Sequence, residues 1–100
     1  MLNITKKLED GILDVALEGR LDTNTAPEFQ KEVEPMLDGI SELKLDCEKL
    51  DYISSAGLRV LLTFEQTLEE QGKKMELRNV NDIIHDVFDV TGFLEIMTIV

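Results

Sequence analysis

The sequence has 100 residues, 43% of them hydrophobic and 31% charged, which is enough for one globular domain that buries its own core. Its formal net charge of −11 excludes binding to nucleic acid or to an anionic membrane through the overall electrostatic field. Acidity of this size either serves solubility alone or indicates a partner with a basic face. The single cysteine, Cys47, excludes a disulfide framework and a cysteine-based metal site.

The sequence shows no signal for export or for membrane insertion. No apolar segment approaches the roughly 18 residues that span a membrane. Residues 1–7 lack the basic and then apolar pattern of a signal peptide. We therefore expect a protein of the reducing cytoplasm. Cys47 alternates with Leu43 and Leu45, so we expect it in the core as a small hydrophobic residue.

The first predicted elements are two strands joined by a tight turn. Alternating apolar residues indicate one strand over residues 2–8 and another over residues 12–18. Asp10 and Gly11 between them supply the positive φ angles of a tight antiparallel hairpin. Residues 19–22 then leave the sheet.

A first helix is predicted to begin at Thr25. Thr25 and Glu28 have the spacing of a capping box, in which each side chain bonds the backbone N–H of the other residue. Pro35 removes a helical hydrogen bond, so it either kinks the helix or separates its last turn. Gly39 ends the helix. Its inward face is predicted to carry Phe29, Val33 and Leu37.

The central segment predicts a strand followed by a long helix. The strand begins near Leu43, continues through Leu50 and Tyr52, and stops at Ser54 and Ser55. The helix extends from about Ala56 to Gln71, and Gly72 follows it in the left-handed conformation. The predicted buried residues of this helix are Leu58, Leu61, Leu62 and Leu68, with Val60 and Phe64 beside them.

The last third of the chain predicts a short strand at Met75 and Leu77 and a helix from Asn81 to Gly92. The apolar residues 93–100 predict a helical turn and an edge strand. The predicted inward residues of the helix are Ile83, Ile84, Val87 and Phe88. The order β-β-α-β-α-β-α-β indicates one α/β domain over residues 1–100, with helices packed on a mixed, mostly parallel sheet of four or five strands.

The candidate catalytic residues do not favour an enzyme. A serine at a strand-to-helix turn is typical of the nucleophile elbow, but Tyr52 and Ile53 stand where its first glycine is needed. The only histidine, His85, lies within the third predicted helix, and no glycine-rich nucleotide motif occurs. We predict no catalytic residue, no metal and no cofactor.

Ser54 and Ser55 lie at a helix start, where unpaired N–H groups and the helix dipole suit an anion. One interpretation is structural, because a serine cap stabilises a helix by about 1 kcal/mol. The other is phosphorylation, which adds about −1.5 to −2 charges. We expect Gly57 to leave the backbone open to a partner or a phosphate. Arg59 is placed to reach back to that phosphate, and Asp22 would repel it if the loop before the first helix lies at the same edge of the sheet.

The stretch Asp51–Leu58 resembles the signature of the STAS domain, most closely that of the stand-alone anti-anti-sigma factors (anti-sigma factor antagonists). Residues 18–26 are similar to the family's Gly-x-Leu/Ile-Asp loop before its first helix. Residues 43–46, running into Leu50 and Tyr52, are similar to the strand before its phosphorylation site. The resemblance extends over essentially the whole chain and implies the STAS fold.

The resemblance implies a binding protein that is switched by phosphorylation. In that family the unmodified protein binds an anti-sigma factor that is a serine kinase, and so frees a sigma factor. The kinase phosphorylates the antagonist and holds the nucleotide, and a PP2C-type phosphatase restores the antagonist. Matched position by position, Ser55 is the phosphoacceptor, Asp22 the loop carboxylate and Gly57 the close-approach glycine. The implied partner-binding residues are Asp22, Thr23, Ser54, Ser55, Ala56, Gly57 and Arg59.

Three residues depart from the commonest family pattern. Ser54 replaces an aspartate and competes with Ser55 as phosphoacceptor, Ala56 replaces a serine or threonine, and Arg59 replaces a glycine and brings a cation into the predicted interface. The alternative function is a fixed STAS interaction module of a transport or stress-signalling complex, with Ser55 only a cap. We expect a monomer when the protein is free.

Overall fold

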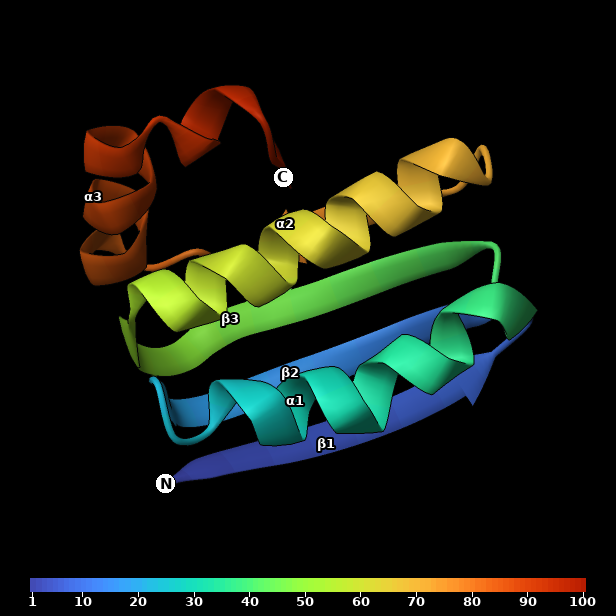
Figure 1. Ribbon diagram of the computed structural model, residues 1–100, viewed down its shortest axis with the longest axis horizontal. Coiled ribbons are helices and arrows are strands. Elements are labelled where there is room, and N and C mark those ends of the chain that lie inside the picture. Colours follow the sequence, from blue (N-terminus) through green and yellow to red (C-terminus); the bar gives the residue numbers. More distant parts are fainter.

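A five-stranded mixed sheet organises the computed structural model, which describes residues 1–100 (Figure 1). The strand order is β1-β2-β3-β4-β5, so each strand lies beside its neighbour in the sequence. Only the first pair is antiparallel, and the other three pairs are parallel. The predicted fold class and element order are confirmed. The strands are β1 (Leu2–Glu9), β2 (Ile12–Leu21), β3 (Glu42–Ile53), β4 (Lys74–Arg78) and β5 (Thr98–Ile99).

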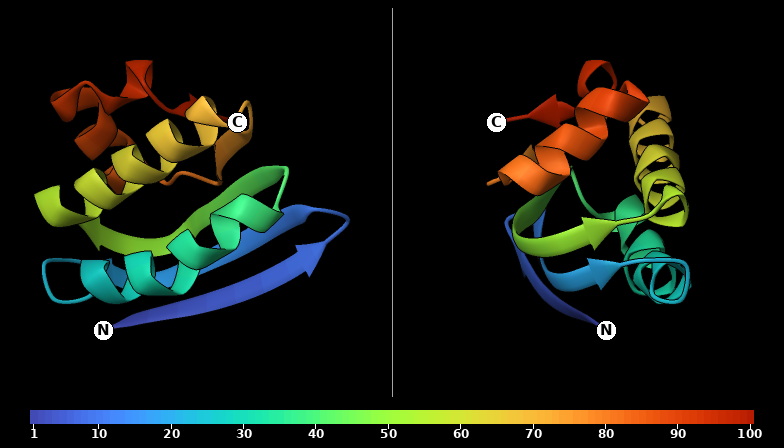
Figure 2. Two further views of the ribbon diagram at one scale, coloured as in Figure 1. Left: turned by 45° about the vertical axis from the view of Figure 1, so that its right-hand side comes forward. Right: turned by 90° about the vertical axis from the view of Figure 1, so that its left-hand side faces the viewer.

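The fold has two main layers, the sheet and a pair of helices packed on one of its faces. Helices α1 (Ala26–Val33) and α2 (Ser55–Glu70) lie side by side on that face, and α3 (Asp82–Thr91) lies at one end of the sheet (Figures 1 and 2). Two short 3₁₀ helices, η1 (Glu34–Gly39) and η2 (Phe93–Glu95), follow α1 and α3. None of the helices combines the length and the apolar character needed to cross a membrane.

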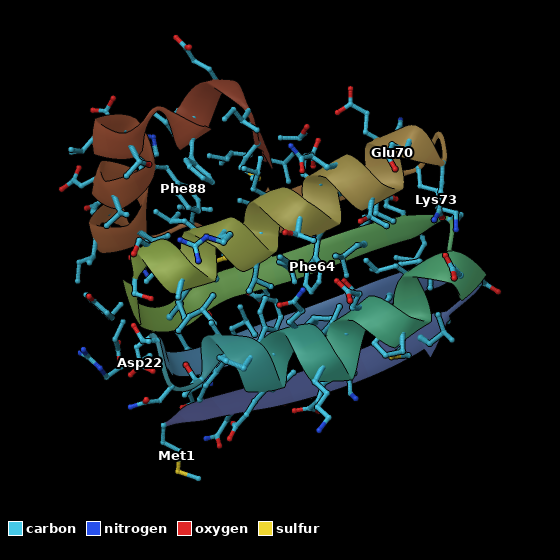
Figure 3. All side chains as sticks on the ribbon, in the orientation of Figure 1. Met1, Asp22, Phe64, Glu70, Lys73 and Phe88 are labelled. Atoms are coloured by element: carbon cyan, nitrogen blue, oxygen red, sulfur yellow. The ribbon has the colours of Figure 1, made fainter.

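The hydrophobic core fills the space between the sheet and the helices. Along β2, buried Leu13, Val15 and Leu17 alternate with exposed residues, so the opposite face of the sheet is polar. Phe29 of α1 and Phe64 of α2 meet edge to face, with their ring centroids 5.3 Å apart. Figure 3 shows Phe64 between the two helices. Because both rings are fully buried, this contact joins the two helices above the sheet. Cys47 is buried as expected.

Turns and helix ends largely follow the sequence signals. Asp10 and Gly11 have φ angles of 54° and 80°, as the predicted hairpin turn requires. Pro35 separates the last turn of the first helix, which becomes η1. The predicted capping box is wrong, because the Thr25 side chain makes no cap hydrogen bond to the helix and instead bonds the backbone of Asp22 in the preceding loop and of Arg20 in β2.

Two predicted inward residues are not in the core. Ile83 is 61% exposed, and Leu62 is only half-buried. Helix α3 lies at the end of the sheet and buries a narrow stripe, Ile84 and Phe88, so the neighbouring position at 83 turns to solvent. The remaining part of the α2 prediction is confirmed, with Phe64 fully buried.

The Asn81 side chain ties α3 to the central strand. The register of β2 and β3 shifts twice, so part of β3 departs from regular pairing. In that part, the carbonyl oxygens of Cys47 and Leu50 accept hydrogen bonds from Asn81 Nδ2 at 3.1 and 2.8 Å. The Asn81 Oδ1 atom accepts from the backbone N–H of Ile84 at 3.0 Å. One amide therefore satisfies the irregular strand and caps the helix.

We predict that Asn81→Ala lowers the free energy of unfolding by about 1–3 kcal/mol, because it leaves the helix N–H and both carbonyl groups without this partner. Asn81→Asp keeps the cap acceptor but loses the donor, so it should also be destabilised. Urea denaturation measures both. Asn24→Ala is the control, since the exposed Asn24 side chain makes no hydrogen bond, and about 0.5 kcal/mol or less is expected. Wild-type stability of Asn81→Asp would contradict the role of the donor.

Candidate functional site

The carboxyl ends of β2 and β3 bring the two predicted site segments together. Leu21 and Ile53, the last residues of these strands, are partners in the parallel register. The backbone N–H of Ser54 then donates to the Leu21 carbonyl oxygen at 2.9 Å. The loop 22–25 therefore lies beside the start of α2, and Figure 3 shows Asp22 at this end of the sheet. Both segments therefore lie at the same end of the sheet.

Asp22 organises the loop from within. Its Oδ1 atom accepts from the backbone N–H groups of Asn24 and Thr25, each at 3.0 Å. The Thr25 hydroxyl accepts from the Asp22 backbone N–H and donates to the Arg20 carbonyl oxygen, both at 2.8 Å. Thr25 is the only polar residue in the buried set. The loop is thus held by its own side chains, and its shape needs no partner.

The strand ends add a cation that sequence reasoning did not single out. The Arg20 guanidinium lies 4.2 Å from the centroid of the Tyr52 ring, and its Nε atom lies 3.7 Å from Asp22 Oδ2. Arg20 and Tyr52 are partners across β2 and β3. Each stands two residues before a predicted site residue, Asp22 or Ser54, and this spacing is the one sequence signal for the pair. The Arg20 guanidinium is therefore already paired with Tyr52 and Asp22.

The two serines have different environments. Ser54 is the N-cap of α2, and its hydroxyl oxygen accepts from the Gly57 backbone N–H at 3.3 Å. Ser55 is the first residue of the helix, one position earlier than predicted. Its side chain is exposed, and its hydroxyl makes no hydrogen bond within the protein. The structure therefore assigns the cap to Ser54 and leaves the Ser55 hydroxyl free.

Gly57 is buried against the ends of the two strands. A Cβ atom at this position would lie 2.8 Å from Leu21 Cγ, 2.9 Å from the Leu21 carbonyl oxygen and 3.0 Å from Ile53 Cγ1. The close approach that requires glycine is thus inside the protein. This corrects the expectation that Gly57 leaves the backbone open to a partner or a phosphate.

A shallow groove runs between the first halves of α1 and α2. It brings together three predicted partner-binding residues, Thr23, Ala56 and Arg59. Arg59 is exposed and forms no ion pair. The complete lining is Thr23, Ala26, Pro27, Gln30, Ala56, Arg59, Val60 and Thr63. Arg59, an unpaired cation, thus lies on the same helix as the unbonded Ser55 hydroxyl.

Other candidate chemistry finds no support in the geometry. No three His, Cys, Asp or Glu side chains converge in a way that suits a metal ion. His85 is exposed on α3 and forms no hydrogen bond through its side chain and no ion pair. Burial raises the pKa of the Cys47 thiol to about 12, so this cysteine stays an uncharged core residue.

We predict that Gly57→Ala destabilises the protein by about 1–3 kcal/mol, despite the gain of about 1 kcal/mol that alanine brings to a helix. The Leu21 carbonyl oxygen cannot move aside, because it accepts the hydrogen bond from Ser54. Gly39→Ala is the control, since its methyl group would meet nothing within 4 Å. Urea denaturation of the two variants should separate them, and equal stabilities would show that α2 has room to move.

We predict a pH-dependent contribution to stability from Asp22. The N–H group of Thr25, followed by that of Asn24, lowers the pKa of the Asp22 carboxyl, and desolvation opposes them. A lowered pKa in the folded state gives stability that is present above the ordinary aspartate pKa of about 3.9 and is lost as the pH falls through the folded value. The advantage of wild type over Asp22→Asn should therefore be largest near neutral pH and shrink below about pH 4.

Urea denaturation at a series of pH values measures the Asp22 contribution. Asp89→Asn removes one negative charge from an exposed carboxyl of α3 that accepts no hydrogen bond, and so controls for net charge. A stability difference between wild type and Asp22→Asn that stays constant with pH would contradict the prediction.

Comparison with known proteins gives concordant matches over nearly the whole chain. The family model described as the STAS domain matches residues 3–100. BtrV of Bordetella bronchiseptica is 32% identical over 99 residues, which cover 98% of this chain and 85% of that protein. The anti-sigma-B factor antagonist of Staphylococcus aureus is 30% identical over 97 residues, which cover 96% of this chain and 90% of that protein.

Solved structures of one protein, SpoIIAA, share the fold. The anti-sigma factor antagonist SpoIIAA in its unphosphorylated form matches with a TM-score of 0.85 and 17% identity, over 98% of this chain and 88% of that one. The phosphorylated form of SpoIIAA from Bacillus matches with a TM-score of 0.79 over 98% of this chain and 91% of that one.

Proposed function

Because this chain belongs to the STAS domain family, we propose that it is an anti-sigma factor antagonist whose binding is switched by phosphorylation of Ser55. The unmodified protein binds an anti-sigma factor with serine kinase activity and so releases a sigma factor. Phosphorylation of Ser55 ends this complex, and a PP2C-type phosphatase restores the binding form. The single observation that carries the proposal is the exposed Ser55 hydroxyl, which makes no bond within the protein.

The accessibility of Ser55 favours it over Ser54 as phosphoacceptor. A kinase must bring the serine oxygen to the γ-phosphate of ATP, so an exposed and unbonded hydroxyl is the better substrate. Ser54 is half-buried, and its oxygen accepts the N-cap bond from Gly57. Phosphorylation of Ser54 would compete with that bond, whereas phosphorylation of Ser55 leaves it intact.

The rigid surroundings of Ser55 support a switch that changes charge and leaves the fold alone. The loop 22–25 is held by Asp22 and Thr25, and the helix start by Ser54 and Gly57. A phosphate would add about −1.5 to −2 charges at this surface, and the positive end of α2 would partly stabilise it. A partner that binds the loop and the first turn of α2 would then meet a new dianion.

Two relatives agree with this proposal in what their names state. The Staphylococcus aureus protein is an anti-sigma-B factor antagonist, and SpoIIAA is an anti-sigma factor antagonist with both unphosphorylated and phosphorylated structures. Both are regulatory binding proteins by name. The alternative, a fixed STAS interaction module of a transport or stress-signalling complex, gives Ser55 no role, and the cap it would supply belongs to Ser54.

We predict that incubation with the cognate anti-sigma factor kinase and ATP places one phosphate on Ser55, detectable by mass spectrometry. Ser55→Ala should lose the phosphate, keep its stability and still bind the kinase. Ser54→Ala is the matched control, because it should still be phosphorylated but lose about 1 kcal/mol of stability with its cap. Binding that persists with no phosphate on wild type, or a phosphate on Ser54, would contradict the proposal, and the first result would favour the fixed module.

A further inference from the structure

Two arginines belong to the site; one is held by neighbouring side chains and the other forms no ion pair. Arg20 lies against Tyr52 and Asp22. Arg59 is exposed at the groove between α1 and α2 and has no acidic partner within ion-pair distance. In a chain of net charge −11, with acidic residues outnumbering basic ones by 21 to 10, an arginine without a carboxylate neighbour is available for another anion.

Arg59 lies one helical turn after Ser55 on α2. The two residues are four positions apart on one helix, which puts their Cβ atoms about 5–6 Å apart. A long side chain on a helix readily leans toward the amino-terminal end, so Arg59, which lines the groove in this structure, can also reach the turn that contains Ser55. An anion four residues before a cation is also the more favourable order for such a pair.

The groove also leaves Arg59 accessible to an anion from another protein. Arg59 lines the groove together with the polar residues Thr23, Gln30 and Thr63 and with the small residue Ala56. The Thr63 hydroxyl donates to the Arg59 carbonyl oxygen at 2.9 Å, which fixes the backbone and leaves the guanidinium free. A planar guanidinium in such a groove suits a carboxylate from another protein, which it can bind through two parallel hydrogen bonds.

We propose that Arg59 is shared between these two anions and so couples phosphorylation to release. In the unmodified protein it binds a carboxylate side chain of the anti-sigma factor. When Ser55 carries a phosphate, the guanidinium turns back to pair with it along α2. Phosphorylation then removes a cation from the interface at the same time as it adds a dianion. This role rests on the proposed function for the phosphate on Ser55 and for the identity of the partner, whereas the pairing of Arg59 with that phosphate is intramolecular.

The intramolecular pairing can be tested without any kinase. Phosphoserine is incorporated at position 55 during translation, and the second pKa of the phosphate, ordinarily about 6, is followed by ³¹P NMR. A nearby guanidinium favours the dianion and lowers this pKa. Arg59→Gln should therefore raise it by about half a unit relative to wild type, and Arg59→Lys should raise it less.

A distant charge deletion controls for net charge in the same titration. Arg78 lies on β4 and pairs with Asp14 on the helix-free face of the sheet, with 3.8 Å between Nη1 and Oδ1. Arg78→Gln should leave the phosphate pKa near the wild-type value. A pKa in Arg59→Gln equal to that of wild type overturns the proposal, whatever the partner does.

The second half of the proposal is tested by binding to the anti-sigma factor kinase. Unphosphorylated Arg59→Gln should bind it about 5- to 10-fold more weakly than wild type, as expected for loss of a charge-assisted contact. Phosphorylation of position 55 should lower the affinity of wild type for the kinase by a larger factor than it lowers the affinity of Arg59→Gln. Equal factors overturn the coupling. A phosphate pKa that responds to Arg59, together with no effect of phosphorylation on binding, would refute the proposed function and leave the intramolecular pair established.

Discussion

The site depends on one close approach between backbone segments, that of the first turn of α2 to the end of β2. Gly57 has no side chain, so the helix rests directly on the Leu21 carbonyl group and on Ile53. The same carbonyl oxygen accepts the N–H of Ser54, which fixes the axial position of the helix start. A larger residue would lift the helix from the strands and separate the serines from the loop 22–25. The orientation of Ser55 toward solvent follows from this contact.

Around that contact the side chains divide into a bonded inner set and a free outer set. Asp22, Thr25 and Ser54 satisfy backbone groups of the loop and the helix. Ser55 and Arg59 carry reactive or charged groups that no internal bond uses. Residues whose side chains hold the fold are poor candidates for modification, because each change costs a structural hydrogen bond. A surface built in this way can change its charge while its shape stays constant.

The order of elements could be predicted from periodicity and turn residues, because strands, helices and the hairpin each have a local signal. The missed features depend on contacts that the local helix and strand patterns do not show. The bonding of Thr25 is decided by the carbonyl group of Arg20 across the loop, which the local spacing with Glu28 does not reveal. The reason for Gly57 lies in Leu21. The exposure of Ile83 depends on how narrow a stripe of α3 meets the sheet, and helical period alone does not give that width.

The sequential strand order has a consequence for synthesis on the ribosome. Each strand after β1 pairs with the strand that precedes it in the chain, so none has to be inserted between two strands that are already paired. The emerging chain can therefore extend the sheet in one direction only. The ends of β2 and β3 and the start of α2 are complete once α2 has emerged, before α3 and β5 emerge. The segments that form the Ser55 surface thus reach solvent before residues 74–100 do.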